Sequence, residues 1–100
     1  MSLRNPKIKL TIIRRKDAAA RLGAKSTWFH ERVKAGLIPP PINLGLRAKG
    51  FVEHELDQVL AFMVAGKSNA EIKILVDHQV KQRQKLLEGT GYELITPTDD

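Results

Sequence analysis

The sequence predicts a mostly α-helical domain with a small β-hairpin. Three features support this prediction: four runs with helical spacing of apolar residues, a glycine after each run, and three consecutive prolines followed by alternating apolar residues. A chain of 100 residues is expected to fold as one domain, and 42% hydrophobic residues are enough for a modest core.

The first structured segments are predicted to be a short strand and a short helix. Residues 8–13 alternate apolar and polar side chains before two isoleucines, which predicts a strand. Residues 14–23 are rich in alanine and predict a helix of about two turns. Asp17 lies in its first turn, where the helix dipole favours an anion, and Gly23 stands at its end.

A second helix is predicted over residues 26–35. Ser26 is a reasonable N-cap, and Lys25 is the other candidate boundary. Phe29 and Val33 are spaced to face the core together, which turns the polar side chains of this helix outward. Two short helices joined by a tight glycine turn, the second opening on small polar residues, are typical of a helix-turn-helix.

The chain then changes from helix to extended structure. The prolines at 39–41 forbid a helix. Residues 42–52 contain two short apolar runs separated by a glycine-bounded loop, which predicts a hairpin with Arg47 and Lys49 at its tip.

Two further helices are predicted after the hairpin, over residues 53–65 and 69–88. The first opens on acidic residues, and the second has a capping box formed by Ser68 and Glu71. The predicted apolar stripes are Leu56, Val59, Leu60 and Met63 on the first of these helices, and Ile72, Leu75, Val76 and Val80 on the second.

Charge is distributed unevenly along the chain. The net charge is +6, with a pI of about 9.9. Residues 1–50 hold twelve lysines and arginines against two acids, a balance of +10, whereas residues 51–100 hold five against nine, a balance of −4. A positive half joined to a negative half is typical of a chain with a polyanion-binding face, although an ordinary basic surface has the same composition.

Several short motifs follow one another between residues 12 and 80. They are Leu22 with Gly23 and Ala35 with Gly36 at helix ends, Pro39 and Pro41, the LGxRA motif at Leu44, Gly45, Arg47 and Ala48, Gly50 before Phe51, and the AGKSNAEI stretch from Ala65. This ordered set resembles the AlpA-like family of phage and prophage transcriptional regulators, which belong with the excisionase-like, MerR-type winged-helix DNA-binding domains.

The resemblance implies a small protein that binds operator or attachment-site DNA. Such a protein either regulates transcription of prophage genes or sets the direction of an integrase. The predicted organisation is a winged helix-turn-helix DNA-binding domain over residues 8–66 and a C-terminal helix over residues 67–88, between flexible ends at 1–7 and 89–100.

Helix-turn-helix geometry divides the candidate residues by their expected DNA contact. Side chains near the start of the second helix reach base edges in the major groove, and the flanking elements hold phosphates. The base-edge candidates are Ser26, Thr27, His30 and Glu31, with Lys34 on the same outward face. The backbone candidates are Arg14, Arg15, Lys16 and Lys25, and the hairpin candidates, beside the minor groove, are Arg47 and Lys49.

These assignments have structural alternatives. The cations at 14–16 and Arg47 could be only solvated surface, and Ser26 could serve only as a cap. Trp28 is either a half-buried strut under the hairpin, which we favour, or an exposed ring that contacts sugar and phosphate.

Catalysis, metal binding and membrane insertion are not predicted. The chain has no cysteine, its three histidines are isolated, and no acid is evident to orient His30 toward Ser26. We therefore expect no enzyme activity, cofactor, metal or small-molecule substrate. No apolar run reaches the length of a membrane span and the chain does not start with a signal-peptide pattern, so a cytoplasmic protein is expected.

The predicted function is sequence-specific binding of double-stranded DNA by a transcriptional regulator of prophage type. One alternative is an excisionase-like architectural factor that bends DNA for an integrase. Another, of a different class, is a protein-interaction module that acts through the helix from Asn69 to Glu88, where Leu86 and Leu87 could also pair with a second copy of the chain.

Overall fold

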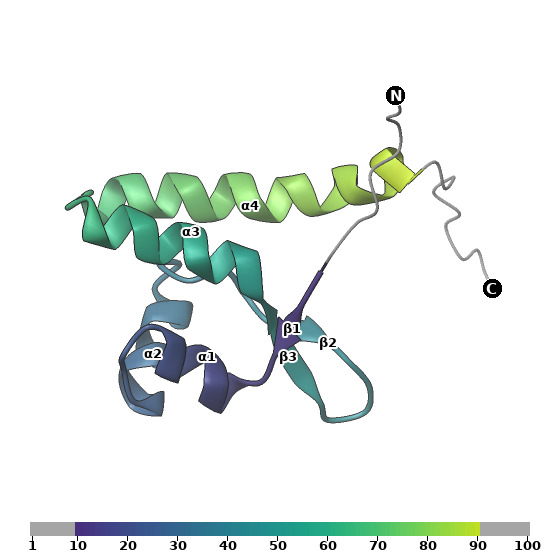
Figure 1. The fold of residues 1–100 in the computed structure, drawn as a ribbon, viewed down its shortest axis with the longest axis horizontal. Helices are drawn as coiled ribbons and strands as arrows, with labels where there is room; N and C mark the ends of the chain where they lie inside the picture. The colour runs from purple at the N-terminus through teal and green to yellow at the C-terminus, as the bar shows by residue number, and fades with distance from the viewer. Residues whose placement is uncertain (1–9, 91–100) are drawn as a thin grey trace.

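The computed structural model describes residues 10–90, and residues 87–90 only as part of the last helix. This part of the chain is mostly helical, with four helices and a small three-stranded antiparallel sheet (Figure 1). In chain order the elements are β1 (Ile12–Ile13), α1 (Arg15–Arg21), α2 (Ser26–Lys34), β2 (Ile42–Asn43), β3 (Lys49–Val52), α3 (Glu53–Val64) and α4 (Asn69–Thr90). Helix α4 lies alongside α3, and α1, α2 and the sheet lie on the other side of α3 (Figure 1).

The sheet has the order β1–β3–β2, so β3 is its central strand. The paired residues are Ile12 with Val52, Ile13 with Phe51, Ile42 with Gly50, and Asn43 with Lys49. Gly50 permits the close approach of β1, because a Cβ atom there would overlap the side chain of Ile12. The motif glycine at this position therefore has a packing role in the sheet.

Two groups of buried side chains form the core, and α3 contributes to both. The first joins α1, α2, β3 and α3, and its members are Ala18, Ala19, Phe29, Ile38, Phe51 and Leu56. The second joins α3 and α4, and its members are Leu37, Val59, Ile72 and Val76. In the first group the rings of Phe29 and Phe51 meet edge to face, with their centroids 4.9 Å apart. This contact packs α2 against the central strand of the sheet.

The predicted elements differ from the observed ones mainly at their ends. Helices α2, α3 and α4 begin at the predicted residues, and α2 and α3 each end one residue earlier than predicted. Helix α4 continues to Thr90, so Gly89, which we expected to end it, lies within the helix. Of the strand predicted over residues 8–13, only Ile12–Ile13 is a strand among the described residues. Of the flexible ends predicted at 1–7 and 89–100, residues 1–7 and 91–100 lie outside the described residues, and residues 89 and 90 belong to α4.

The apolar stripe predicted for α4 is wrong at Val80. Ile72 and Val76 are buried against α3, and Leu75 is half-buried beside them. The side chain of Val80 is 37% exposed, and Gln79 is buried instead. Gln79 is seven residues after Ile72, which is almost two full turns of helix at about 3.6 residues per turn, so the two side chains lie on the same face. Val80 is one residue further on, and its side chain is therefore turned about 80° away from that of Ile72.

Helix α4 is 22 residues long, and charged residues recur along it. None of the helices between residues 10 and 90 is both long enough and apolar enough to cross a membrane.

The predicted capping box at the start of α4 is confirmed. The backbone N–H of Ser68 donates to Glu71 Oε1 over 2.9 Å, and the backbone N–H of Glu71 donates to Ser68 Oγ over 3.2 Å. These bonds satisfy donors that a helix start otherwise leaves free. The backbone hydrogen bond from Ser68, and then the bond from its hydroxyl, lower the pKa of Glu71 below its ordinary value of 4.5.

The charge of Glu71 is therefore expected to stabilise the protein in a pH-dependent way. Because its pKa is lower in the folded state, the stabilisation is complete above the unfolded pKa and is lost as the pH falls through the folded pKa. We expect Glu71→Gln to lower Tm at about pH 6, and this difference to vanish at more acidic pH. Thermal unfolding of both proteins across the acidic range measures the difference, and a gap that does not change with pH would contradict the prediction.

Candidate nucleic-acid interface

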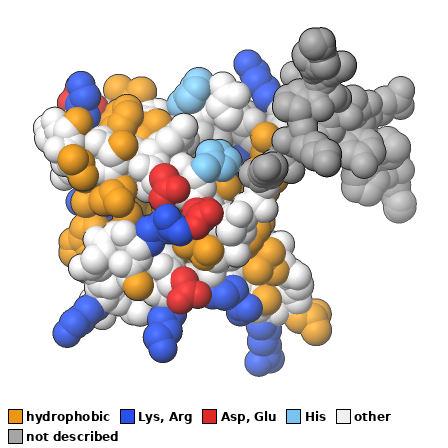
Figure 2. Space-filling view, viewed as in Figure 1, with side chains coloured by type: hydrophobic (Ala, Val, Ile, Leu, Met, Phe, Trp, Pro, Cys, Tyr) orange, Lys and Arg blue, Asp and Glu red, His pale blue; other side chains and the backbone are white. Residues whose placement is uncertain are grey.

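Five lysine and arginine side chains surround one open hollow beside the sheet. Three come from the N-terminal end of α1 and two from the β2–β3 hairpin: they are Arg14, Arg15, Lys16, Arg47 and Lys49. Among the residues that the structure describes, no acidic side chain lines this hollow. Figure 2 shows lysine and arginine side chains along the lower edge of the molecule, where α1, α2 and the hairpin lie in Figure 1. A concave surface with charges of one sign attracts a polyanion.

The strand register brings these two segments together. β1 and β3 run antiparallel, with Ile13 opposite Phe51. The chain that follows Ile13 therefore runs back alongside the residues that precede Phe51, which places Arg14 and Arg15 next to Lys49. Pairing between strands about 40 residues apart thus assembles the basic hollow from two short basic segments.

The hairpin loop holds Arg47 but not Lys49. The loop is closed by a hydrogen bond of 2.8 Å from the backbone N–H of Leu44 to the carbonyl of Ala48. Arg47 lies within the loop, as predicted. Lys49 was predicted at the tip, but it is the first residue of β3, because strand pairing already begins between Lys49 and Asn43. Both cations nevertheless line the hollow.

Arg15 connects the basic hollow to α2. Its guanidinium carbon lies 5.9 Å from the centroid of the Phe51 ring, and its Nη1 lies 3.0 Å from Nδ1 of His30. A guanidinium can only donate, so Nδ1 of His30 accepts this bond, and a neutral imidazole then carries its proton on Nε2. His30 is exposed, so the structure presents this N–H donor to solvent beside the hollow.

The outward face of α2 has the predicted orientation. Phe29 is fully buried, and half-buried Val33 packs against the same core group. The exposed side chains of this helix are Ser26, Thr27, Trp28, His30, Glu31 and Lys34. Helix α2 is therefore held by one face and presents a mostly polar opposite face.

The N-cap of α2 lies one residue before Ser26, the cap residue that we favoured. Lys25, the other candidate boundary, takes the N-cap position and Ser26 is the first helical residue, so the assignment of Ser26 as N-cap is wrong and the alternative is correct. The turn after α1 leaves Lys25 in the extended conformation that an N-cap residue needs, and its side chain makes no capping bond. The first turn also contains no acidic residue. A helix start without a capping side chain has N–H groups available to an anion such as phosphate.

Trp28 lies on the side of α2 that faces α1 and α3. Its side chain is 38% exposed, and it lines a shallow hollow with Leu22, Lys25 and Met63. The structure therefore does not support a strut under the hairpin, the role that we favoured. The guanidinium of Arg32 lies over the indole, 5.0 Å from its centroid, in a cation–π contact. We did not predict this partner, although the two residues have the i, i+4 spacing of helix neighbours.

The opposite end of α1 is neutralised by α3. Arg21 pairs with Glu53 and with Asp57, the latter over 3.0 Å. We expected the acidic residues at the start of α3 to interact favourably with the helix dipole. Two of them, Glu53 and Asp57, also form these ion pairs with Arg21. The basic hollow and this ion-pair group lie at opposite ends of α1, which concentrates the positive charge near the hairpin.

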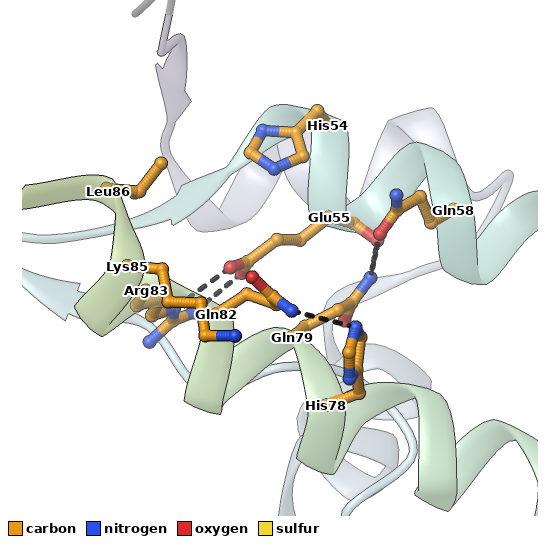
Figure 3. A pocket seen from close by; sticks show the side chains of 9 residues that line it. All are labelled: His54, Glu55, Gln58, His78, Gln79, Gln82, Arg83, Lys85 and Leu86. Carbon is orange, nitrogen blue, oxygen red and sulfur yellow. Dashed lines mark hydrogen bonds and ion pairs between the residues drawn. The ribbon is translucent and has the colours of Figure 1, made fainter. Parts of the chain in front are cut away.

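A polar interface between α3 and α4 was not predicted. Figure 3 shows the side chains of Glu55 and Arg83 pointing toward each other. Arg83 donates from Nη2 and Nε to the two carboxylate oxygens over 2.7 and 3.0 Å, and from Nη2 to the carbonyl of Pro40 over 2.8 Å. Gln79 donates to the carbonyl of Glu55 over 3.0 Å and to Gln58 Oε1 over 2.8 Å.

The same interface lines a hollow of about 390 Å³, which also contains His54 and His78 (Figure 3). Glu55 and Arg83, which line it, already bind each other, and Glu55 is only 3% exposed. These contacts hold α4 against α3 and the proline segment. No three His, Cys, Asp or Glu side chains gather as a metal site anywhere in the described range, residues 10–90.

Comparison of the chain with models of known protein families, with curated proteins and with solved structures found no match.

Proposed function

We propose that the protein is a sequence-specific DNA-binding transcriptional regulator of prophage type, built as a winged helix-turn-helix. The observation that carries this proposal is the basic hollow, in which five cations from α1 and the hairpin meet next to the polar face of α2. The motif set that resembles the AlpA-like family supports the same class. In this arrangement α2 is the recognition helix and the β2–β3 hairpin is the wing.

Helix α2 enters the major groove in this proposal. The groove of B-DNA is about 12 Å wide and admits a single helix, whose first residues reach the base edges. Thr27 offers a methyl group and a hydroxyl, Glu31 accepts from cytosine N4, and His30 offers its Nε2–H. The uncapped first turn after Lys25 fits a phosphate at the edge of the groove.

The basic hollow holds the DNA backbone beside that groove. Arg14 and Lys16 are exposed, so both can reach phosphate oxygens without loss of packing. Arg47 projects from the loop of the hairpin toward the minor groove, where its guanidinium favours a narrow and negative segment. Phosphate contacts fix the register of the protein, and α2 supplies the sequence preference.

Selection from a random pool of duplex oligonucleotides, followed by footprinting, tests the proposal. We expect a selected duplex to bind at least about tenfold more tightly than a scrambled one. We also expect the logarithm of the association constant to fall with the logarithm of salt concentration with a slope of about −4.5, because each of the five cations of the hollow would neutralise one phosphate and each neutralised phosphate contributes about −0.9. Absence of duplex binding at low salt would rule out the proposal.

The two alternative functions, an architectural DNA-bending factor and a protein-interaction module, can be tested with the same protein and the selected duplex. An architectural, excisionase-like factor requires a bent complex, so a straight complex would exclude that function, whereas a bent complex is compatible with both functions. A protein-interaction module would use the exposed apolar residues of α4, Ile74 and Val80, which are 70% and 37% exposed. For that module, Thr27→Ala and Arg47→Ala would leave partner binding unchanged, whereas in the proposed regulator each is expected to weaken binding to the selected duplex.

A further inference from the structure

The loop of the hairpin exposes a leucine at its tip. Leu46 has a relative exposure of 105%, and its neighbour Leu44 has 45%. A single exposed leucine on a protein surface needs no explanation. Leu46 is informative because of its position: turn residues are usually polar, and this leucine directly precedes Arg47, which lines the basic hollow.

The backbone of the loop holds Leu46 away from the domain. The bond between the Leu44 N–H and the Ala48 carbonyl closes the base of the loop. Gly45 has a φ of +155°, a conformation that other residues rarely adopt, and Leu46 follows directly. Leu46 belongs to neither buried core group. The side chain therefore extends into solvent from a loop whose base is fixed.

We propose that Leu46 is an apolar wedge that enters the minor groove and partly unstacks one base step. The inference rests on the proposed function and adds a DNA deformation to it. Leucine is one of the side chains that minor-groove proteins insert between bases, and the resulting kink is roughly 20–90°. The cations beside Leu46 hold the backbone close enough for the insertion, because Arg47 and Lys49 belong to the same hairpin.

The surroundings of Leu46 favour DNA over a protein partner. The exposed apolar surface at the tip consists of two leucines, which is small for a protein-binding patch. Arg47 follows Leu46 directly in the loop and lines the basic hollow together with Arg14 and Lys16, so the cations on this side of the domain match a polyanion in charge. Flexible pyrimidine–purine steps are the easiest to unstack, so the selected sites should place such a step under the hairpin.

The test uses the full chain and the selected duplex, with 2-aminopurine replacing one adenine at a time across the footprint of the hairpin. Circular-permutation gel shifts measure the bend, and 2-aminopurine fluorescence reports unstacking. The variant is Leu46→Ser, which removes no buried surface and is expected to fold normally. Leu46→Met keeps an apolar wedge, and Ile74→Ser removes an exposed apolar side chain from α4 instead.

We expect the wild-type protein to bend the duplex and to raise the fluorescence at one step. Leu46→Ser should lose both effects while its affinity changes by less than about tenfold, because the burial of the wedge and the unstacking that it requires offset each other. Both control variants should behave as the wild type. A straight wild-type complex, or an equal bend with Leu46→Ser, overturns the inference and leaves the proposed function standing. If the wild-type protein binds no duplex, both fail.

Discussion

Replacement of Arg83 with alanine is expected to lower the free energy of unfolding by about 3 kcal/mol. The variant leaves the carboxylate of Glu55, which is 3% exposed, without its ion-pair partner. It also removes the donor to the Pro40 carbonyl. We place the effect at the lower end of the range for buried pairs, because the Arg83 side chain is 21% exposed and water can partly replace it. Urea unfolding followed by far-UV circular dichroism measures the loss.

Two further variants separate the buried charge from general damage to α4. Lys81→Ala removes an exposed cation of the same helix, whose pair with Asp77 is solvated, and should change the stability by less than about 1 kcal/mol. The double variant Glu55→Leu with Arg83→Met removes both charges and should recover most of the loss, since a buried pair can be replaced by apolar side chains at little cost. A double variant less stable than Arg83→Ala would contradict this account.

The second large effect that we expect is a loss of affinity for DNA. The double variant Arg14→Ala with Arg47→Ala removes one cation from each side of the basic hollow. If each contributes a charge-assisted hydrogen bond of about 1.5 kcal/mol, the affinity for the selected duplex should fall by about 100-fold. The salt slope should become less steep by about 1.8, because two phosphate contacts are lost. Fluorescence anisotropy at several salt concentrations measures both quantities.

A matched control separates the hollow from the net charge of the protein. Lys73→Ala with Lys81→Ala removes the same charge from the exposed surface of α4. This variant should retain nearly the wild-type affinity and salt slope, because screening limits the reach of an exposed charge to about 10 Å at 0.1 M salt. Equal losses in the two double variants would show that the hollow has no special role.

The order and type of most elements could be predicted from local signals. Glycines after helical runs, the proline segment and the capping box are all short-range features, and they located the four helices within a few residues. The inner face of α2 followed from the spacing of Phe29 and Val33, which the core confirms. These features depend on neighbours within about one turn of helix, which the sequence displays directly.

The assembly of the basic hollow could be predicted only in part. Each of its five cations was a DNA-contact candidate, but the meeting of Arg14 with Lys49 depends on the pairing of β1 with β3. That pairing involves strands of two and four residues, which carry little periodicity. The sequence therefore indicated which residues are basic, and the register determined which of them share a surface.

The polar interface between α3 and α4 was missed because charged and amide residues were assumed to be solvated. Glu55 is four residues before Val59, and Arg83 is four residues after Gln79, so each continues a buried helix face. An apolar stripe that ends in a polar residue at the same spacing is the signal that could have revealed the pair. Trp28 was misplaced because Met63, which lines the same hollow, comes from α3, a helix distant in the sequence.

The pairing of β1 with β3 also has a consequence for how such a chain can diversify. All twelve candidate DNA-contact residues lie in the contiguous segment from Arg14 to Lys49. The pairing of β1 with β3 brings the two ends of this segment together. A single exchange of this contiguous segment between related genes would replace the whole proposed DNA-contact surface and leave α3 and α4 unchanged. Such a recombinant has to conserve the small set of side chains that meet Phe51 and Leu56, chiefly Ala18, Phe29 and Ile38. In the proposed regulator, the preference for a DNA sequence would then evolve separately from the scaffold formed by α3 and α4.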